Sequence, residues 1–260
     1  MPLPLRTPLG WLQLRHRPVR LLVAIAGISF AVMLILMQLG FRAALFESTL
    51  RFHERFRYDI ALFSADSVFI VRPQAFSIRR LYQALAVGGV SDVTPVYILP
   101  AIWKNPWTND RRNINAVGFN PEDAALATPG LDEALPLLRR QDVVLFDQGS
   151  RPEFGPVAER LQAGEKVITE INDREIEVAA LFEIGPSFGI DGTVVTSDDN
   201  WLRLFPDWSR DDIHLGLIRL ADSANTADAQ KTLQQLLPED VLVLTRAQFI
   251  AQEKAVSYTH

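Results

Sequence analysis

The sequence has no cysteine, which excludes disulfides, thiolate metal sites and cysteine nucleophiles. Its four histidines are scattered and lack the spacing of metal ligands. It also lacks the phosphate-binding loop Gly-x4-Gly-Lys-Ser/Thr and the nucleophile elbow Gly-x-Ser-x-Gly. The net charge is −5 and no basic stripe lies beyond the flanks of the apolar N-terminal segment, so the pattern of a nucleic-acid-binding protein is absent. These absences predict a protein that is not an enzyme, holds no cofactor or metal and binds no nucleic acid.

One long apolar run stands out in what the sequence does contain. It extends from Leu21 to Phe41 without a charge, and its only clearly polar side chains are Ser29 and Gln38. As a helix it would be about 31 Å long, close to the hydrocarbon thickness of a bilayer. Twelve of its residues are Leu, Ile, Val or Phe, which together favour membrane insertion by about 5 kcal/mol. Residues 21–41 are therefore predicted to span a membrane.

Two other interpretations compete with a permanent span. A cleaved signal peptide has a shorter apolar core and small residues at its cleavage site, whereas this run is long and is followed by Phe41-Arg42-Ala43. A buried core helix is usually amphipathic, and this run is apolar on every face. Within the span, Gly27 and Ala31 are four residues apart, a spacing that lets a second helix approach closely.

The charges beside the apolar run bear on its orientation. Four arginines precede the run and four follow it, so the number of positive charges alone does not decide which end is cytoplasmic. Arg15, Arg17 and Arg20 lie close to the membrane on the N-terminal side. This cluster favours a cytoplasmic segment at residues 1–20 and places the bulk of the chain on the other side of the membrane.

The remaining sequence predicts a mixed α+β domain. Apolar residues at three-to-four spacing predict a membrane-proximal stalk helix over residues 42–57, continuing to Tyr58. Residues 58–245 form the predicted core domain, with two lobes, and residues 246–260 begin a further helix. The predicted strands are 58–63, 67–71, 90–103, 113–119, 143–146, 166–171, 174–184, 193–196, 213–220 and 241–244. The predicted helices are 77–87, entered through Ser77 as N-cap, and 200–205 and 224–237.

Two local patterns carry more detailed predictions. Residues 166–184 read as a β-hairpin with Asn172-Asp173 at the turn, and Ile176, Val178, Ala180 and Phe182 are predicted to face one side of it. The imidazole of His214 lies among strand residues and is predicted to be packed rather than to act as a base. The acid pairs Asp198-Asp199 and Asp211-Asp212 are predicted to cap or to be solvated, and Asp191-Gly192 to form a turn.

Several longer strings resemble one protein family. The string Thr7-Pro8-Leu9-Gly10-Trp11 precedes the apolar run and Met37-Gln38-Leu39-Gly40-Phe41 ends it. Further along come Arg151, Pro152, Glu153, Phe154 and Gly155, the string Phe188-Gly189-Ile190-Asp191-Gly192-Thr193, and Asn200-Trp201-Leu202-Arg203-Leu204-Phe205. In this order they resemble DevC-type permeases, the cyanobacterial relatives of MacB-type ABC exporter permeases. The resemblance extends from about Thr7 to Lys254.

This resemblance implies an inner-membrane protein with its N-terminus in the cytoplasm and its main domain in the periplasm. Relatives form a permease dimer that works with a separate ABC ATPase subunit, a membrane-fusion-type adaptor and a TolC-like outer-membrane channel. Their role is mechanical and recognitive, and DevC relatives are linked to the export of glycolipids. The resemblance therefore predicts a lipid-like or glycolipid substrate for this chain.

The sequence departs from the family pattern at its C-terminal end. The family has four membrane helices, and the chain ends at His260 after a segment, Phe249-Ile250-Ala251-Gln252-Glu253-Lys254, that resembles the lead into the second helix. It thus resembles a truncated or frame-shifted permease, or one part of a split gene, which we expect not to couple ATP hydrolysis to transport on its own. The main alternative is a single-span, membrane-anchored extracytoplasmic sensor or binding module; a tethered hydrolase lacks a nucleophile or metal set.

Overall fold

The computed structural model describes residues 18–67, 74–187, 189–249 and 251, and for residues 42–54 it describes the backbone alone. The described chain divides into two compact units, one ending at Phe46 and the other beginning at Glu47. Each unit is described separately below. The predicted strand at 67–71 and most of the predicted C-terminal helix lie outside the described residues; residues 246–249 are helical.

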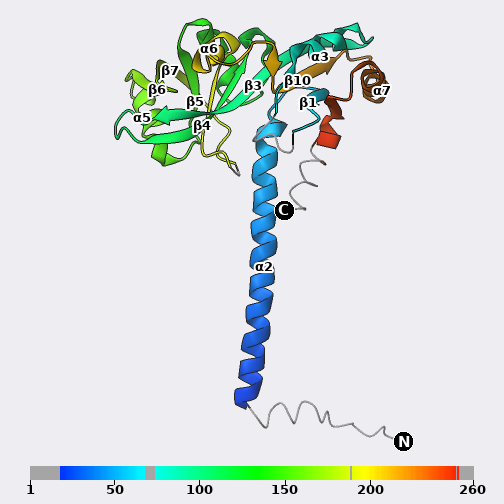
Figure 1. Cartoon of the computed structure of the whole chain (residues 1–260). Coiled ribbons are helices and arrows are strands. Elements are labelled where there is room, and N and C mark those ends of the chain that lie inside the picture. The colour runs from blue at the N-terminus through cyan, green and yellow to red at the C-terminus, as the bar shows by residue number, and fades with distance from the viewer. Residues whose placement is uncertain (1–17, 68–73, 188, 250, 252–260) are drawn as a thin grey trace, which may run out of the picture. The chain divides into compact units, whose positions relative to one another are not determined.

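A single long helix contains the apolar run. Helix α2 spans Pro18–Glu54 without a break (Figure 1). Within Pro18–Phe41 the most apolar stretch of 18 residues has a mean hydropathy of 2.5, and none of its residues is buried. A helix that leaves its apolar side chains uncovered is not the core helix of a soluble domain, which excludes that interpretation of the sequence. By length and composition this segment is able to cross a membrane.

The predicted stalk helix is four residues too long at its C-terminal end. Helix α2 ends at Glu54 rather than at Tyr58. The reason is pairing with a distant segment: Phe56 forms an isolated β-bridge with Leu126, and the backbone N–H of Arg57 donates to the carbonyl of Ala125 at 2.8 Å. Because the backbone groups of Phe56 and Arg57 are bonded to residues 125 and 126, they cannot continue the hydrogen-bond pattern of the helix.

The second unit is an α+β domain, as the sequence predicts, and the structure shows that it is built on a nine-stranded sheet. The strand order is β11-β1-β10-β3-β4-β8-β5-β7-β6. The strands are β1 (Ile60–Ser64), β3 (Val90–Lys104), β4 (Arg111–Phe119), β5 (Val143–Asp147), β6 (Val167–Ile171), β7 (Arg174–Phe182), β8 (Thr193–Ser197), β10 (Leu215–Leu220) and β11 (Val241–Thr245). Strands β2 (Phe76–Ser77) and β9 (Asp212–Ile213) form a separate two-stranded sheet.

Six of these strands close into a ring. Going round, β3 pairs with β4, β4 with β8, β8 with β5, β5 with β7 and β7 with β6, and the pairs Trp103–Ile171 and Lys104–Glu170 join β6 back to β3. Side chains that alternate along the strands fall into two buried clusters. Ile114, Ala116, Val144 and Phe146 belong to one cluster, whereas Val117, Val143 and Leu145 belong to the other.

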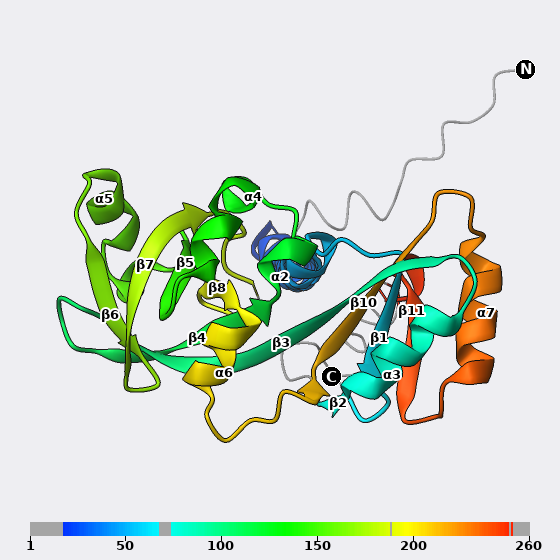
Figure 2. The same cartoon turned by 90° about the horizontal axis from the view of Figure 1, so that it is seen from above.

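Strand β3 connects the two halves of the sheet. One half is the ring, and the other contains β11, β1 and β10. Residues 90–96 pair with β10, and residues 97–104 pair with β4 (Figure 2). Between β10 and β6 one side of β3 lacks a neighbouring strand, and side chains replace it. His214 Nδ1 accepts from the N–H of Ile98 at 3.1 Å, and Asn172 Oδ1 accepts from Ile102 at 2.8 Å. Pro100, between them, has no N–H that needs a partner.

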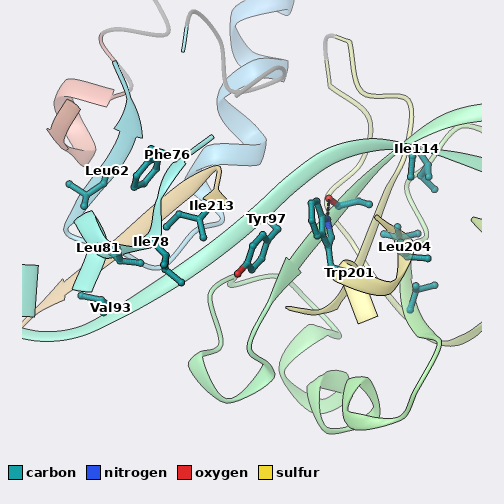
Figure 3. Close-up of a cluster of buried hydrophobic side chains, with 14 of the residues drawn as sticks. Leu62, Phe76, Ile78, Leu81, Val93, Tyr97, Ile114, Trp201, Leu204 and Ile213 are labelled. Atoms are coloured by element: carbon teal, nitrogen blue, oxygen red, sulfur yellow. Dashed lines mark hydrogen bonds between the residues drawn. The ribbon is translucent and has the colours of Figure 1, made fainter. Parts of the chain in front are cut away.

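Helices pack against the sheet, and their buried side chains belong to the same two clusters as those of the strands. They are α3 (Ile78–Gln83), α4 (Leu131–Ala134), α5 (Val157–Gln162), α6 (Asp198–Leu204) and α7 (Thr226–Leu236), with short 3₁₀ turns η1 (Ala84–Ala86), η2 (Pro121–Asp123), η3 (Leu135–Arg139) and η4 (Pro152–Phe154). One buried cluster follows β3 from Leu81 and Val93 in one half of the sheet to Trp201 and Ile114 in the other (Figure 3). The two predicted lobes are therefore two halves of one compact unit.

Most predicted local features agree with the structure. Ser77 caps α3, and Asn172 and Asp173 make the predicted turn with φ values of 50° and 61°. One prediction for the hairpin is wrong. The pairing of β7 with β5 shifts by one residue between Val144 and Leu145, so Phe182 joins the opposite buried cluster from Val178. The extra residue of a bulge reverses the faces of every residue that follows it.

Candidate functional site

The residues predicted to lie in the membrane all fall on α2. Gly27, Ala31, Gln38 and Phe41 are exposed, and Leu21 is half-buried. A Cβ added at Gly27 would meet no atom within 4 Å. Close approach of another helix at Gly27 and Ala31 stays a prediction.

Two segments of the domain that resemble the permease family, residues 151–155 and the pair Asp191-Gly192, meet at one end of the strand ring. They are called the two motif segments below. The backbone N–H of Arg151 donates to the carbonyl of Asp191 at 2.9 Å. Their side chains also form an ion pair, with 2.6 Å between Arg151 Nε and Asp191 Oδ1. Both side chains are about half exposed, so the ion pair contributes little to stability. Backbone pairing, rather than charge, joins the two segments.

The buried carboxylate of Asp147 organises the loops that carry both segments. Asp147 ends β5 and is fully buried. Its Oδ1 accepts from the N–H groups of Gly149 and Ile184 at 3.0 and 2.9 Å, and its Oδ2 accepts from Gly185 at 2.9 Å. Burial raises the pKa of the Asp147 carboxyl, while the three backbone donors act in the opposite direction. One side chain thus fixes the start of the loop after β5 and the loop after β7.

Phe154 anchors the motif in the core. It is fully buried and contacts the rings of Trp103 and Phe146, each with a centroid distance of 6.4 Å. The indole N–H of Trp103 donates to the carbonyl of Phe154 at 3.2 Å. Gly192 lies against the same ring, because an added Cβ there would come within 2.7 Å of Phe154. Phe154 and Gly192 of the two motif segments are therefore packing residues.

A third segment, which the sequence analysis did not single out, completes the site. In the turn between β3 and β4, Asn105 is buried and bonds both ways: its Oδ1 accepts from the N–H of Trp107 at 2.9 Å, and its Nδ2 donates to the carbonyl of Glu153 at 3.1 Å. Gly155 has φ +99°, and an added Cβ would lie 2.5 Å from Trp107 Cε3. Asn-Pro-Trp in a polar turn is a signal that could have been noticed, because a tryptophan there is rarely solvated without a reason.

These three segments border a cleft of about 600 Å³. Its lining includes Trp107, Arg112, Pro152 and Glu153, and Asp191 lies at its margin through an ion pair with Arg112. The neighbouring Ser150 Oγ is buried without a hydrogen-bond partner in the described structure, so no base is hydrogen-bonded to it there. Among the described residues no group of three His, Asp or Glu is placed to hold a metal. The arrangement offers binding groups and no activated nucleophile.

His214 does not line this cleft and lies in an aromatic environment in the core. It is fully buried, stacked on Trp208 at 4.7 Å and edge-on to Trp201 at 5.9 Å. Burial lowers the pKa of His214 from 6.5 to about 4, so the ring is neutral at physiological pH. Its role is the hydrogen bond to β3 described above, and the prediction of a packed imidazole is confirmed. The acids Asp198 and Asp199 begin α6 and form ion pairs with Arg210.

Comparison with known proteins gives a fold relationship. No protein-family model and no curated protein sequence matches the chain. Among solved structures it is similar to the periplasmic region of MacB from Actinobacillus actinomycetemcomitans, with a TM-score of 0.52 and 15% identity over 76% of this chain and 92% of that one. The domain therefore has the fold of that periplasmic region.

Two further structures are similar at lower scores. The extracellular domain of the noncanonic ABC-type transporter YknZ from Gram-positive bacteria gives a TM-score of 0.46 and 14% identity, over 72% of this chain and 99% of that one. A domain of a permease protein from Porphyromonas gingivalis gives 0.40 and 15% identity, over 72% and 90%.

Proposed function

We propose that this chain is a permease subunit of an ABC exporter, or part of one, anchored by α2 and carrying its domain outside the cytoplasm. One combination of features supports the proposal: an exposed apolar helix long enough to cross a bilayer and a domain with the MacB periplasmic fold occur in the same chain. The N-terminus is then cytoplasmic and the domain periplasmic. The strings that resemble DevC-type permeases favour the DevC-type branch of these exporters and a lipid-like or glycolipid substrate.

In this proposal the domain acts mechanically. Strand β3 runs through both halves of the sheet, and one buried cluster extends along it, so the halves move as a single body. A separate ABC ATPase would supply the energy, and a second permease chain would complete a dimer. The domain would pass the resulting movement to an adaptor of the membrane-fusion type that leads to a TolC-like channel.

The end of the strand ring that carries Arg151, Glu153 and Asp191 is the face we assign to the adaptor. These side chains are about half exposed, and the backbone beneath them is fixed by Asp147 and Phe154. A rigid backbone that presents charged groups is suited to recognition, since little conformational entropy is lost on binding.

A photo-crosslinking experiment tests this assignment. A photoreactive amino acid replaces Glu153 in the full chain, which is expressed with the adaptor and ATPase of the same organism. The control position is Tyr82, which is 51% exposed and lies on α3, a helix that packs against β10 outside the strand ring. We expect adaptor crosslinks from position 153 and few from position 82. Equal yields would contradict the assigned face, and failure of the ATPase to co-purify with the chain would contradict the exporter proposal.

A further inference from the structure

The indole ring of Trp107 is partly exposed to solvent and is held in place by the residues beneath it. It is 39% exposed, and within the domain, as far as it is described, it is the one aromatic ring so exposed that also borders the cleft. Its inner side lies against Gly155, where any side chain would collide with the ring. The side chain of Asn105 holds the turn, accepting from the N–H groups of both Trp107 and Thr108. The exposed ring therefore has a defined position before any ligand arrives.

The polar groups beside the ring are incompletely paired. Arg112 Nη1 lies 3.9 Å from Glu153 Oε1 and 3.9 Å from Asp191 Oδ2, too far for hydrogen bonds. Among the described residues, the carboxylate of Asp191 has a close partner, Arg151, and that of Glu153 has none. A guanidinium with unused donors and a carboxylate with unused acceptors thus stand next to each other. Together they match a ligand whose neighbouring groups each donate and accept hydrogen bonds.

The charge of the cleft indicates the class of that ligand. The charged residues in its lining are two acids and two arginines, Asp110, Glu153, Arg111 and Arg112, so its formal net charge is zero. A cleft for an anion or a cation would carry an excess of the opposite charge. The weakly positive C–H face of a pyranose is attracted to the negative face of an indole ring, and its vicinal hydroxyls both donate and accept.

From this juxtaposition we propose that the cleft binds a neutral saccharide, with one sugar ring stacked on Trp107 and hydroxyl groups bonded to Arg112 and Glu153. The site belongs to the domain alone. It therefore goes beyond the proposed function and would remain if the chain proved not to belong to an exporter.

Binding of neutral oligosaccharides to the full chain tests the proposal. The probes are maltohexaose, cellohexaose and laminarihexaose, which differ in linkage. The protein is kept in lauryldimethylamine oxide micelles, since a maltoside detergent would itself offer sugar rings. Saturation-transfer NMR identifies the bound ring, and calorimetric titration gives the dissociation constant. We expect saturable binding of at least one probe.

Four variants connect the binding to the cleft. Trp107→Ala and Arg112→Gln are each expected to weaken binding about tenfold. Trp107→Phe keeps an aromatic face and is expected to bind better than Trp107→Ala. Ile168→Ala, at an exposed apolar position outside the cleft lining, is expected to bind like the unchanged protein. Circular dichroism confirms that each variant is folded.

Three outcomes overturn the proposal. One is that none of the three probes binds saturably. Another is that Trp107→Ala, shown to be folded, binds as tightly as the unchanged protein. The third is that a protein partner requires Trp107 while the sugars do not bind, which would make the cleft a protein-docking site. None of these outcomes bears on whether the ATPase co-purifies with the chain, so the exporter proposal stands or falls separately.

Discussion

Helix α2 and the sheet domain place the same kinds of side chain in opposite environments. Of the twenty exposed large hydrophobic side chains in the described structure, fourteen lie between Val19 and Phe41 and six lie in the domain. In the domain the apolar residues fill two buried clusters, and of the described Asp, Glu, Lys and Arg side chains only that of Asp147 is buried. A domain arranged in this way is stable in water, whereas a helix with an uncovered apolar surface requires another solvent. The difference assigns the two regions to different surroundings.

The largest expected effect breaks this difference by adding charge to the helix. Two arginines near the centre of the apolar run, Phe30→Arg with Leu34→Arg, cost about 6 kcal/mol of insertion free energy, more than the roughly 5 kcal/mol that favours the span. We expect alkaline carbonate to release this double variant from membranes and to leave the unchanged chain in the pellet. Ile102→Arg with Ile168→Arg adds the same charge at exposed domain positions and should stay in the pellet. Release of the unchanged chain would show that α2 does not span.

The next effect compares truncation of a side chain in the two regions. Trp201 is fully buried, and its indole N–H donates to the carbonyl of Ala116 at 3.0 Å. Trp201→Ala should lower the domain's free energy of unfolding by about 4 kcal/mol. Leu34→Ala should leave it unchanged, because Leu34 lies in the exposed apolar run of α2 and not in the folded domain. Denaturant unfolding followed by near-ultraviolet circular dichroism measures both values, and an equal loss in the two variants would contradict the comparison.

A third prediction contrasts two charged residues of the site. Asp147→Ala removes the acceptor of three N–H groups, that of Ile184 buried and those of Gly149 and Gly185 partly buried, and should lower the free energy of unfolding by about 3 kcal/mol. The matched change Arg151→Ala breaks an exposed ion pair and should cost less than about 1 kcal/mol. Chemical denaturation provides the measurement. If Arg151→Ala proved as destabilising as Asp147→Ala, the motif would be structural rather than a recognition surface.

The smallest effect concerns pH and the neutral imidazole in the core. Because the pKa of His214 is about 4 in the folded chain and 6.5 when unfolded, the unfolded state binds more protons between these values. Stability is therefore full above pH 6.5 and falls as the pH approaches 4, by about 2 kcal/mol between pH 7 and pH 5. His214→Asn retains an acceptor for Ile98 and should lose this part of the pH dependence. An unchanged pH dependence in that variant would refute the assignment.

The sequence predicted local structure well where a local pattern determined it. The strand at 90–103, the Ser77 cap and the Asn172-Asp173 turn all depend on neighbouring residues. The closure of the ring through Trp103 and Ile171 depends on strands far apart in sequence, and no local pattern specifies it. The face reversal at Phe182 arises for a similar reason, since a bulge is set by the neighbouring strand.

The candidate site was predicted in part. The motif strings around Arg151 and Asp191 were identified, yet nothing local showed that they meet. Their meeting depends on Asp147, which the sequence shows only as an acid after a short apolar run. Trp107 joins them because Gly155 leaves room for its ring, a contact between segments that periodicity cannot reveal.

Labelling of single cysteines tests most directly whether α2 spans a membrane, with the chain before it and the domain after it on opposite sides. The chain has no cysteine, so each introduced thiol is unique. Asp222→Cys lies at an exposed turn of the domain, and Thr7→Cys precedes α2. With a membrane-impermeant maleimide on intact spheroplasts, we predict that position 222 is labelled at once and position 7 only after the membrane is disrupted. Labelling of position 7 alone, or of both positions in intact spheroplasts, would contradict a spanning helix with its domain outside the cytoplasm.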